Sequence, residues 1–306
     1  MEFPEKQEEK IKLKEGNTYF FICFALVCGG KSTFFEQIIS QTTSEQNKDK
    51  YNIKIVSSDK IREDLSLQMQ KKNPNMTFKQ CFDKVGKETA KKFDAQIRTA
   101  INEKMEDKIN IILVDKNYPQ GIGKFLKSFC KDISSQFFLV FIPNIKKSID
   151  INGLKFPYSL NYFIQCYLRL KNRHGHEVLN GEDESSKAVY LSFFKLFQDF
   201  DFYKKINSDK QYENNVFLNT IDFTDESKDI EVDKDTEIFI ENVIKHLRAF
   251  DMENIKTNYE KDINSYFNII DEKYDGKGFF ADTRELIKNQ VIDLLENGIN
   301  KLKINI

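Results

Sequence analysis

The chain has 306 residues, and its 47 basic and 48 acidic side chains leave a formal net charge of −1. This balance argues against a protein that coats nucleic acid by bulk electrostatics, although it allows a local basic groove. The longest apolar run, residues 19–28, is about half as long as a membrane-spanning helix must be. Five scattered cysteines and the lack of an apolar leader predict a soluble protein with reduced thiols, in the cytoplasm or the nucleus.

Strand patterns and helix patterns alternate along the chain. The predicted strands cover residues 18–27, 53–57, 109–114, 137–142 and 216–223. The predicted helices cover residues 31–40, 77–108, 160–170, 186–197 and 236–250. This alternation predicts an α/β fold, in which a parallel sheet of about five strands is sandwiched by helices with right-handed crossovers.

The same patterns divide the chain into three parts. Residues 1–16 are rich in charge and predict a flexible arm, whereas residues 17–250 hold the alternating strands and helices. Residues 251–306 show no further strand pattern, only helix-like segments at 254–270 and 281–303. We expect them to form a helical extension packed on the core, which would offer a docking surface to a protein partner.

A Gly-rich turn follows the first predicted strand. It reads Ala25-Leu26-Val27-Cys28-Gly29-Gly30-Lys31-Ser32-Thr33, which is the phosphate-binding pattern Gly-x4-Gly-Lys-Ser/Thr with Ala in the first place. The two glycines tolerate positive φ, so the backbone N–H groups of residues 28–33 can surround a phosphate at a helix N-terminus. Lys31 would reach the β- and γ-phosphates, and Ser32 would hold Mg²⁺. The alternative is a chance turn in a Lys-rich chain, but its place between a buried strand and a helix favours phosphate binding.

A carboxylate and an arginine follow the second predicted strand, in the segment Ser57-Ser58-Asp59-Lys60-Ile61-Arg62. The carboxyl ends of parallel strands surround the ligand, so Asp59 is placed to take the proton of an attacking hydroxyl. Arg62, one helical turn later, would bind an anionic group on the acceptor. The alternative is an N-cap Asp59 beside a solvated Arg62, which is commoner for such a segment taken alone.

Further charged residues follow the third and fourth predicted strands. Asp115 ends an apolar strand, the position from which a carboxylate supports Mg²⁺. Arg169 and Arg173 lie one turn apart on a predicted helix. On a mobile helical lid they would close on the phosphates and neutralise transition-state charge, whereas on an ordinary helix they would form a solvated face.

The order of these motifs resembles the polynucleotide 5'-hydroxyl kinases, and most closely the kinase domain of the fungal-type tRNA ligases. The resemblance covers about residues 17–250. In that family an Asp serves as general base and an Arg three residues later binds the acceptor, a spacing that Asp59 and Arg62 match. The tRNA ligase kinases also have Ala where other P-loops have the first Gly, as at Ala25.

Two further motifs carry the resemblance. The family's Asp-Arg/Lys-Asn-Asn is similar to residues 115–117, although Tyr118 replaces the second Asn. The family's lid, with two arginines and a His-containing segment, is similar to Arg169, Arg173 and His176.

The resemblance implies a P-loop kinase that moves the γ-phosphate of ATP or GTP, with Mg²⁺, to the 5'-hydroxyl of an RNA or DNA end. The catalytic residues would be Lys31, Asp59, Arg62, Arg169 and Arg173. Two other interpretations stay open. The same machinery could phosphorylate a small-molecule alcohol, which the near-neutral charge favours slightly. The chain could also be a catalytically idle kinase-like subunit with a structural role.

Overall fold

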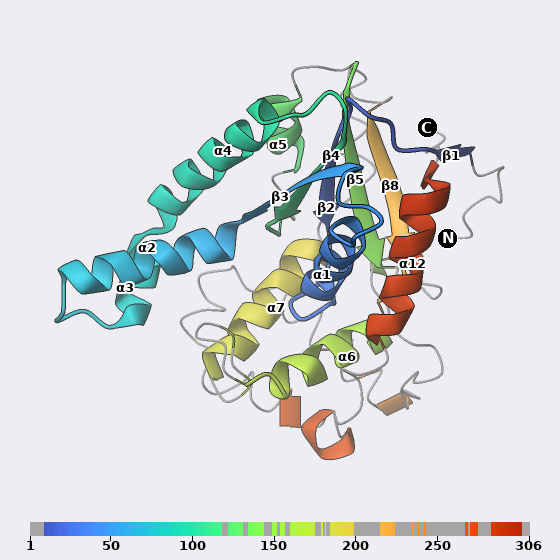
Figure 1. Ribbon diagram of the computed structural model, residues 1–306. Coiled ribbons are helices and arrows are strands. Elements are labelled where there is room, and N and C mark those ends of the chain that lie inside the picture. Colours follow the sequence, from blue (N-terminus) through green and yellow to red (C-terminus); the bar gives the residue numbers. More distant parts are fainter. Residues whose placement is uncertain are drawn as a thin grey trace.

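Five parallel strands form the central sheet of the computed structural model, in the order β3-β4-β2-β5-β8 (Figure 1). They are β2 (Thr18–Cys23), β3 (Tyr51–Ser57), β4 (Ile109–Asp115), β5 (Gln136–Pro143) and β8 (Val216–Ile221). The structure describes residues 9–117, 122–130, 134–143, 149–151, 154–156, 160–174, 179, 181, 184–198, 215–223, 234–235, 238, 242, 267–268, 270–274 and 283–301. The sheet and its flanking helices confirm the predicted α/β fold.

Eight helices can be traced among the described residues. They are α1 (Lys31–Thr42), α2 (Ser58–Lys72), α3 (Phe78–Lys84), α4 (Gly86–Asn102), α5 (Ile122–Phe129), α6 (Leu160–Lys171), α7 (Glu184–Gln198) and α12 (Thr283–Asn297). Figure 1 shows α1 and α12 side by side on one face of the sheet, with α6 and α7 beyond the carboxyl ends of the strands. In the described part of the chain, every helix is too short or too polar to cross a membrane.

The central strand β2 is buried along its whole length, as its apolar sequence predicts. Successive side chains of a strand point to opposite faces. On one face Phe20 stacks on Phe138, with ring centroids 4.5 Å apart, and meets Phe125 of α5. On the other face, the ring centroid of Phe141 lies 4.7 Å from that of Phe34 in α1. Helices thus cover both faces, which leaves the carboxyl edge of the sheet as the place for a site.

The order of strands reverses direction at β2. The chain passes from β2 to β3 at the edge, returns through β4 beside β2, and then crosses to β5 on the other side of β2. A crevice opens outside the carboxyl ends of the strands at such a switch point. The predicted phosphate-binding turn follows β2, so the topology places it at this crevice.

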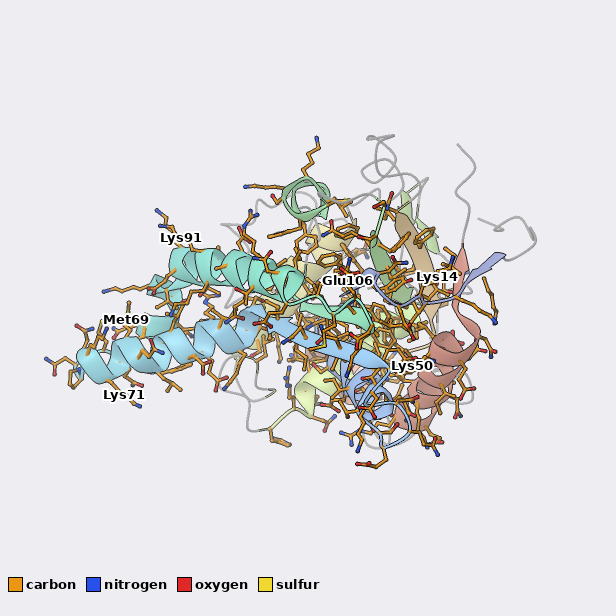
Figure 2. The ribbon with its side chains drawn as sticks, turned by 45° about the horizontal axis from the view of Figure 1, so that its top comes forward. Lys14, Lys50, Met69, Lys71, Lys91 and Glu106 are labelled. Atoms are coloured by element: carbon orange, nitrogen blue, oxygen red, sulfur yellow. The ribbon has the colours of Figure 1, made fainter. Side chains whose placement is uncertain are left out.

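The predicted helix 77–108 is two helices, and α2 precedes them. Thr77 begins α3 with a capping box, in which it and Gln80 bond each other's backbone N–H groups. Val85 ends α3 and begins α4 with a φ of −83° and a ψ of 2°, which breaks the helical pattern. Helices α2 to α4, residues 58–102, stand out from the sheet as a helical projection (Figures 1 and 2).

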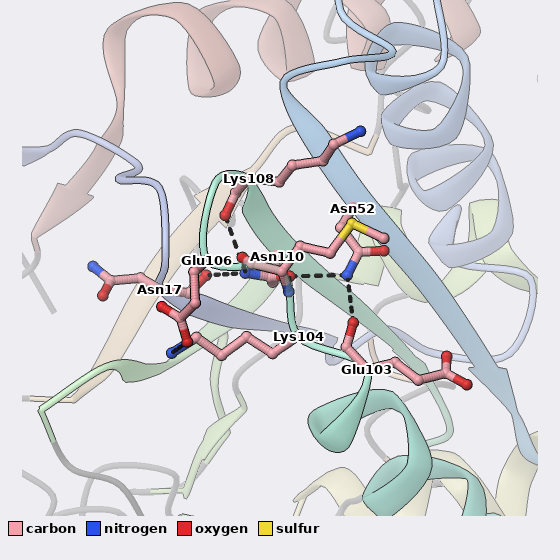
Figure 3. A network of polar contacts seen from close by, with 8 residues as sticks. Asn17, Asn52, Glu103, Lys104, Glu106, Lys108 and Asn110 are labelled. Atoms are coloured by element: carbon pink, nitrogen blue, oxygen red, sulfur yellow. Dashed lines mark hydrogen bonds and ion pairs between the residues drawn. The ribbon is translucent and has the colours of Figure 1, made fainter.

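A network of amides fastens the amino edge of the sheet (Figure 3). The buried side chain of Asn110 donates to the carbonyl oxygens of Asn17, Met105 and Lys108. It accepts hydrogen bonds from the Met105 amide at 2.8 Å and from the Asn52 side chain at 2.9 Å. The Asn110 side chain thereby satisfies both backbone groups of Met105 in the turn before β4.

The structure differs from the predictions at both ends of the described chain. Strand β9 (Ile299–Lys301) pairs antiparallel with β1 (Glu9–Ile11), so a strand does follow residue 250 and part of the predicted arm is a strand. Both strands have three residues, too few for a periodic pattern. A second short pair, β6 (Ile149–Ile151) and β7 (Leu154–Phe156), was not predicted. Residues 1–8 and most of 236–266 lie outside the described residues.

Helix α12 packs on the core as expected of the C-terminal extension. Its buried residues Thr283, Ile287, Val291 and Leu295 recur every four positions and so share one face. Gln290 exchanges two hydrogen bonds with the backbone of Asp222, just after β8, at 2.8 and 3.0 Å.

The replacement Ile287→Ala tests this packing. Ile287 is fully buried, so we expect the substitution to lower the free energy of unfolding by about 2–5 kcal/mol in urea denaturation. Asn289→Ala, at an exposed position of the same helix, should change it by less than about 0.5 kcal/mol. Equal effects of the two substitutions would show that α12 does not bury this face.

Candidate functional site

The turn between β2 and α1 has the backbone of a phosphate cradle. Helix α1 begins at Lys31, and its N-cap Gly30 has a φ of 99° and makes no side-chain cap hydrogen bond. The first N–H groups of a helix have no partner within it, and they carry partial positive charge. This 12-residue helix therefore presents donors and a favourable dipole to an anion, as the sequence predicts.

Both glycines of the cradle are required by close contacts. A Cβ on Gly30 would lie 2.8 Å from Cδ1 of Phe223, and a Cβ on Gly29 would lie 2.7 Å from the Leu26 oxygen. Tyr162 at the start of α6 donates from its hydroxyl to the Gly29 oxygen at 3.2 Å. Phe223, just after β8, and Tyr162 of α6 thus pack against the cradle, which has no room for side chains at positions 29 and 30.

The first position of the phosphate-binding pattern has no such requirement. Among the described residues, Cys28 is the only non-glycine residue with a positive φ, at 61°. Ala25 is fully buried and adopts an ordinary backbone conformation. The replacement of the first Gly by Ala therefore costs no backbone strain here, whereas the left-handed Cys28 costs roughly 1–2 kcal/mol.

An ion pair joins the cradle to the neighbouring strand. Lys31 Nζ pairs with Oδ1 of Asp115, the last residue of β4. The other carboxylate oxygen accepts a hydrogen bond of 2.7 Å from the hydroxyl of Ser57, the last residue of β3. Asp115, half-buried at the carboxyl edge, thus links the start of α1 to the ends of β3 and β4.

Burial lowers the pKa of Lys31, and nearby charges modify that shift. The carboxylate of Asp59 acts to raise the pKa, and the guanidinium of Arg173 acts to lower it further. These influences place Asp59 and Arg173 in the electrostatic surroundings of Lys31. The contacts agree with these influences, because Asp59 stands two residues after Ser57, which binds Asp115, and Arg173 contacts Cys28 of the turn.

Asp59 does not cap its helix, which contradicts the alternative that it serves only as an N-cap. The N-cap of α2 is Ser57, whose hydroxyl accepts a hydrogen bond of 3.3 Å from the Lys60 amide. Asp59 is instead the second residue of the helix, and its side chain is exposed. An acidic side chain in the first turn is favoured by the helix dipole. Its exposure leaves the carboxylate open to an acceptor.

Arg62 is not a freely solvated side chain either. Its guanidinium lies over the ring of Phe82 in α3, 3.8 Å from the centroid, and its Nε donates to the Phe82 carbonyl oxygen at 2.9 Å. Partial burial lowers its pKa, while Asp83 and Asp59 act in the opposite direction. Because a guanidinium has five N–H donors, the Phe82 carbonyl leaves it able to bind an anion as well.

The structure separates the two predicted lid arginines. Arg173 lies at the cradle, with Nη1 3.8 Å from Sγ of Cys28. Burial raises the pKa of the Cys28 thiol although Arg173 acts to lower it, so the guanidinium faces a neutral thiol. Arg169 is only 5% exposed and donates to the Phe223 oxygen at 3.0 Å and to the Thr283 hydroxyl at 3.4 Å. Arg169 fastens α6 to the end of β8 and to α12, and its charge, like that of Arg173, acts to lower the pKa of the Cys28 thiol.

The two residues predicted to hold Mg²⁺ supply a hydroxyl and a carboxylate, which are oxygen ligands of the kind that this ion takes. Ser32 lies exposed in the first turn of α1, and Asp115 ends β4, where it pairs with Lys31 of the same turn. Within the described residues, no group of three or more His, Cys, Asp or Glu side chains forms a metal cage. Mg²⁺ commonly takes one or two carboxylates and completes its shell with water and substrate phosphates, which matches this sparse set. Thr33, also predicted to line the cradle, is half-buried at the third position of α1.

Three contributors escaped the sequence analysis. Ser57 positions Asp115, Tyr162 supports the cradle, and Phe82 holds Arg62. Ser57 stood beside the predicted motif, so its place at the end of a strand gave a usable signal. Tyr162 and Phe82 lie 133 and 20 positions from the residues they contact, and the spacing of the motifs gives no sign of them.

Replacing each lid arginine by Ala should separate a structural role from a role at the cradle. Arg169→Ala leaves the buried Phe223 carbonyl without its donor, so we expect the free energy of unfolding to fall by about 1–3 kcal/mol. Arg173→Ala should change it by less than about 0.5 kcal/mol, because among the described residues the Arg173 side chain makes a hydrogen bond to a thiol alone. Urea denaturation of both variants measures this difference, and a larger loss for Arg173→Ala would contradict the assignment.

No protein-family model matches this chain, and no curated protein matches it. One solved structure, described as the crystal structure of a fungal RNA kinase, aligns with 84% of this chain and 99% of its own, at 13% identity and a TM-score of 0.36. At that identity and TM-score the alignment assigns neither an activity nor a substrate to this chain.

Proposed function

We propose that this protein is a phosphotransferase that moves the γ-phosphate of ATP or GTP to the 5'-hydroxyl of an RNA or DNA end. The observation that carries the proposal is the ion pair of Lys31 with Asp115, whose other oxygen binds Ser57, the N-cap of the helix on which Asp59 stands at the same edge of the sheet. A phosphate-binding lysine, a metal-binding carboxylate and a base are the parts that transfer to an alcohol requires.

Each part has a task that its position allows. The N–H groups of residues 28–33 and the ammonium of Lys31 would hold the phosphates of the donor. Ser32 and Asp115 would hold Mg²⁺, which supplies positive charge to the phosphates when bound. Arg173, beside Cys28, is placed to neutralise charge that develops on the transferred group.

Asp59 and Arg62 would act on the acceptor. The exposed carboxylate of Asp59 would take the proton of the attacking hydroxyl. Arg62 lies one turn further along α2, where its stacking on Phe82 holds the guanidinium in place. A hydroxyl with a phosphate nearby, as at a nucleic-acid 5' end, suits this pair better than an uncharged alcohol does.

The test is transfer of labelled γ-phosphate from ATP, and separately from GTP, to a short 5'-hydroxyl RNA. We expect Asp59→Asn to lower kcat by roughly 10²- to 10⁴-fold with little change in the KM of the nucleotide, because it removes the base and leaves the cradle intact. Asp64→Asn, at an exposed position of the same helix, is the matched control and should act like the wild type.

Two results would overturn parts of the proposal. An unchanged kcat in Asp59→Asn would show that another group takes the proton. Transfer by the wild type to small alcohols, but to neither RNA nor DNA, would replace the polynucleotide acceptor by a small molecule. If the wild type hydrolyses the nucleotide or transfers its phosphate and Lys31→Ala does neither, the activity belongs to this cradle.

A further inference from the structure

The helical projection carries a concentrated positive charge from the end of α2 to the start of α4. Residues 71–92, here called the basic tip, hold seven lysines against only Asp83 and Glu88, a net charge of +5 in a chain of net charge −1. The stretch of the projection before it, residues 58–70, is slightly acidic. The near-zero net charge of the whole chain therefore includes a strongly basic segment, residues 71–92 of the projection.

The lysines of the basic tip are exposed and largely without counter-charges. All seven are exposed, and only Lys92 lies near a carboxylate, 3.9 Å from Glu88. Within the described part of the chain, the other six have no carboxylate within ion-pair distance: Lys71, Lys72, Lys79, Lys84, Lys87 and Lys91. Like charges one turn apart on a helix, such as Lys87 and Lys91, repel each other. A polyanion bound there would relieve that repulsion.

The projection connects the basic tip to the candidate site. Helix α2 starts one residue before Asp59 and has 15 residues, so Lys72 at its end stands about 20 Å from Asp59. Helix α3 turns back, and its Phe82 contacts Arg62, so the basic tip extends from that far end toward the candidate site. A nucleic-acid strand that rises about 3.4 Å per nucleotide, as in a duplex, would place roughly six nucleotides between Asp59 and Lys72. Figure 2 shows Lys71 and Lys91 on the outer sides of the projection, far from Lys14 and Lys50 at the opposite end of the molecule.

The chemistry of the tip favours nucleic acid over an apolar partner or a membrane. Among the described residues, the exposed large apolar side chains are Ile55, Leu67, Met105 and Ile238, and none of them belongs to residues 71–92. Phosphate backbones are bound by lysines without apolar contacts, whereas membrane insertion and most protein interfaces need them.

We propose that the basic tip binds the phosphate backbone of the acceptor strand, several nucleotides away from the end that is phosphorylated. This inference rests on the proposed function for the direction of the strand, and on the charge and exposure of residues 71–92 for the contact itself. The tip would then select long acceptors over short ones without reading their sequence.

The experiment compares two quadruple variants with the wild type. The tip variant replaces Lys71, Lys72, Lys87 and Lys91 by Gln, and the control variant replaces the exposed Lys12, Lys14, Lys48 and Lys50 by Gln. Both variants lose the same charge, and neither alters a buried residue. Fluorescence anisotropy measures their binding to a 3'-labelled single-stranded 5'-hydroxyl RNA of about 20 nucleotides over a range of salt concentrations.

We expect the tip variant to bind this RNA about tenfold or more weakly at low salt. The slope of log K against log salt should fall by up to about 3, since each phosphate contact on a single strand contributes about 0.7. The control variant should change binding by less than about twofold. Phosphorylation of a nucleoside 3'-phosphate, too short to reach the tip, should be the same in all three proteins.

The outcomes distinguish this proposal from the proposed function. Equal RNA binding by the tip variant and the control variant would overturn the role of the tip, whether or not phosphate is transferred. Displacement of RNA by polyglutamate at the same charge concentration would overturn its assignment to nucleic acid. Weaker RNA binding by the tip variant alone would support it, even if the wild type transferred no phosphate and the proposed function failed.

Discussion

The ion pair between Lys31 and Asp115 holds the carboxyl edge of the sheet together. Burial makes the charge of Lys31 costly, so the ammonium needs a carboxylate beside it. That carboxylate comes from β4, the parallel neighbour of β2, and Ser57 at the end of β3 binds its other oxygen. Since Ser57 also caps α2, the same contacts set where Asp59 stands. Loss of either partner of the pair would leave a half-buried charge uncompensated.

The residues around this ion pair fall into two groups, one bound to the core and one exposed at the root of the projection. Tyr162 and Arg169 of α6 bind the cradle and the end of β8, which fixes the phosphate-binding turn against the core. Asp59 and Arg62, by contrast, stand at the root of a projection that leaves the sheet. Under the proposed function, the fastened turn would hold the phosphate donor, and the residues at the root of the projection would receive a large, anionic acceptor.

Much of the fold could be predicted because the strands are strongly apolar and alternate with helices. The positions of the turn before α1, of Asp59 and of Asp115 at one edge of the sheet were predictable for the same reason, since parallel strands bring their carboxyl ends together. Contacts between distant segments were not. The four-residue spacing of Arg169 and Arg173 predicts a shared helix face, but α6 ends at Lys171. Packing then decides that Arg169 is buried against Phe223 and that Arg173, beyond the helix, reaches Cys28. The pairing of β1 with β9 joins three-residue strands that carry no readable pattern.

The most direct test of the account is calorimetric titration of ATP and GTP, with Mg²⁺, into the wild type and into Lys31→Gln. The account predicts that the wild type binds a nucleoside triphosphate more tightly than the matching monophosphate. It also predicts that Lys31→Gln loses about tenfold or more in affinity, the value of a charged hydrogen bond to phosphate. Absence of binding to the folded wild type, or equal affinity in the variant, would contradict a phosphate site at this cradle.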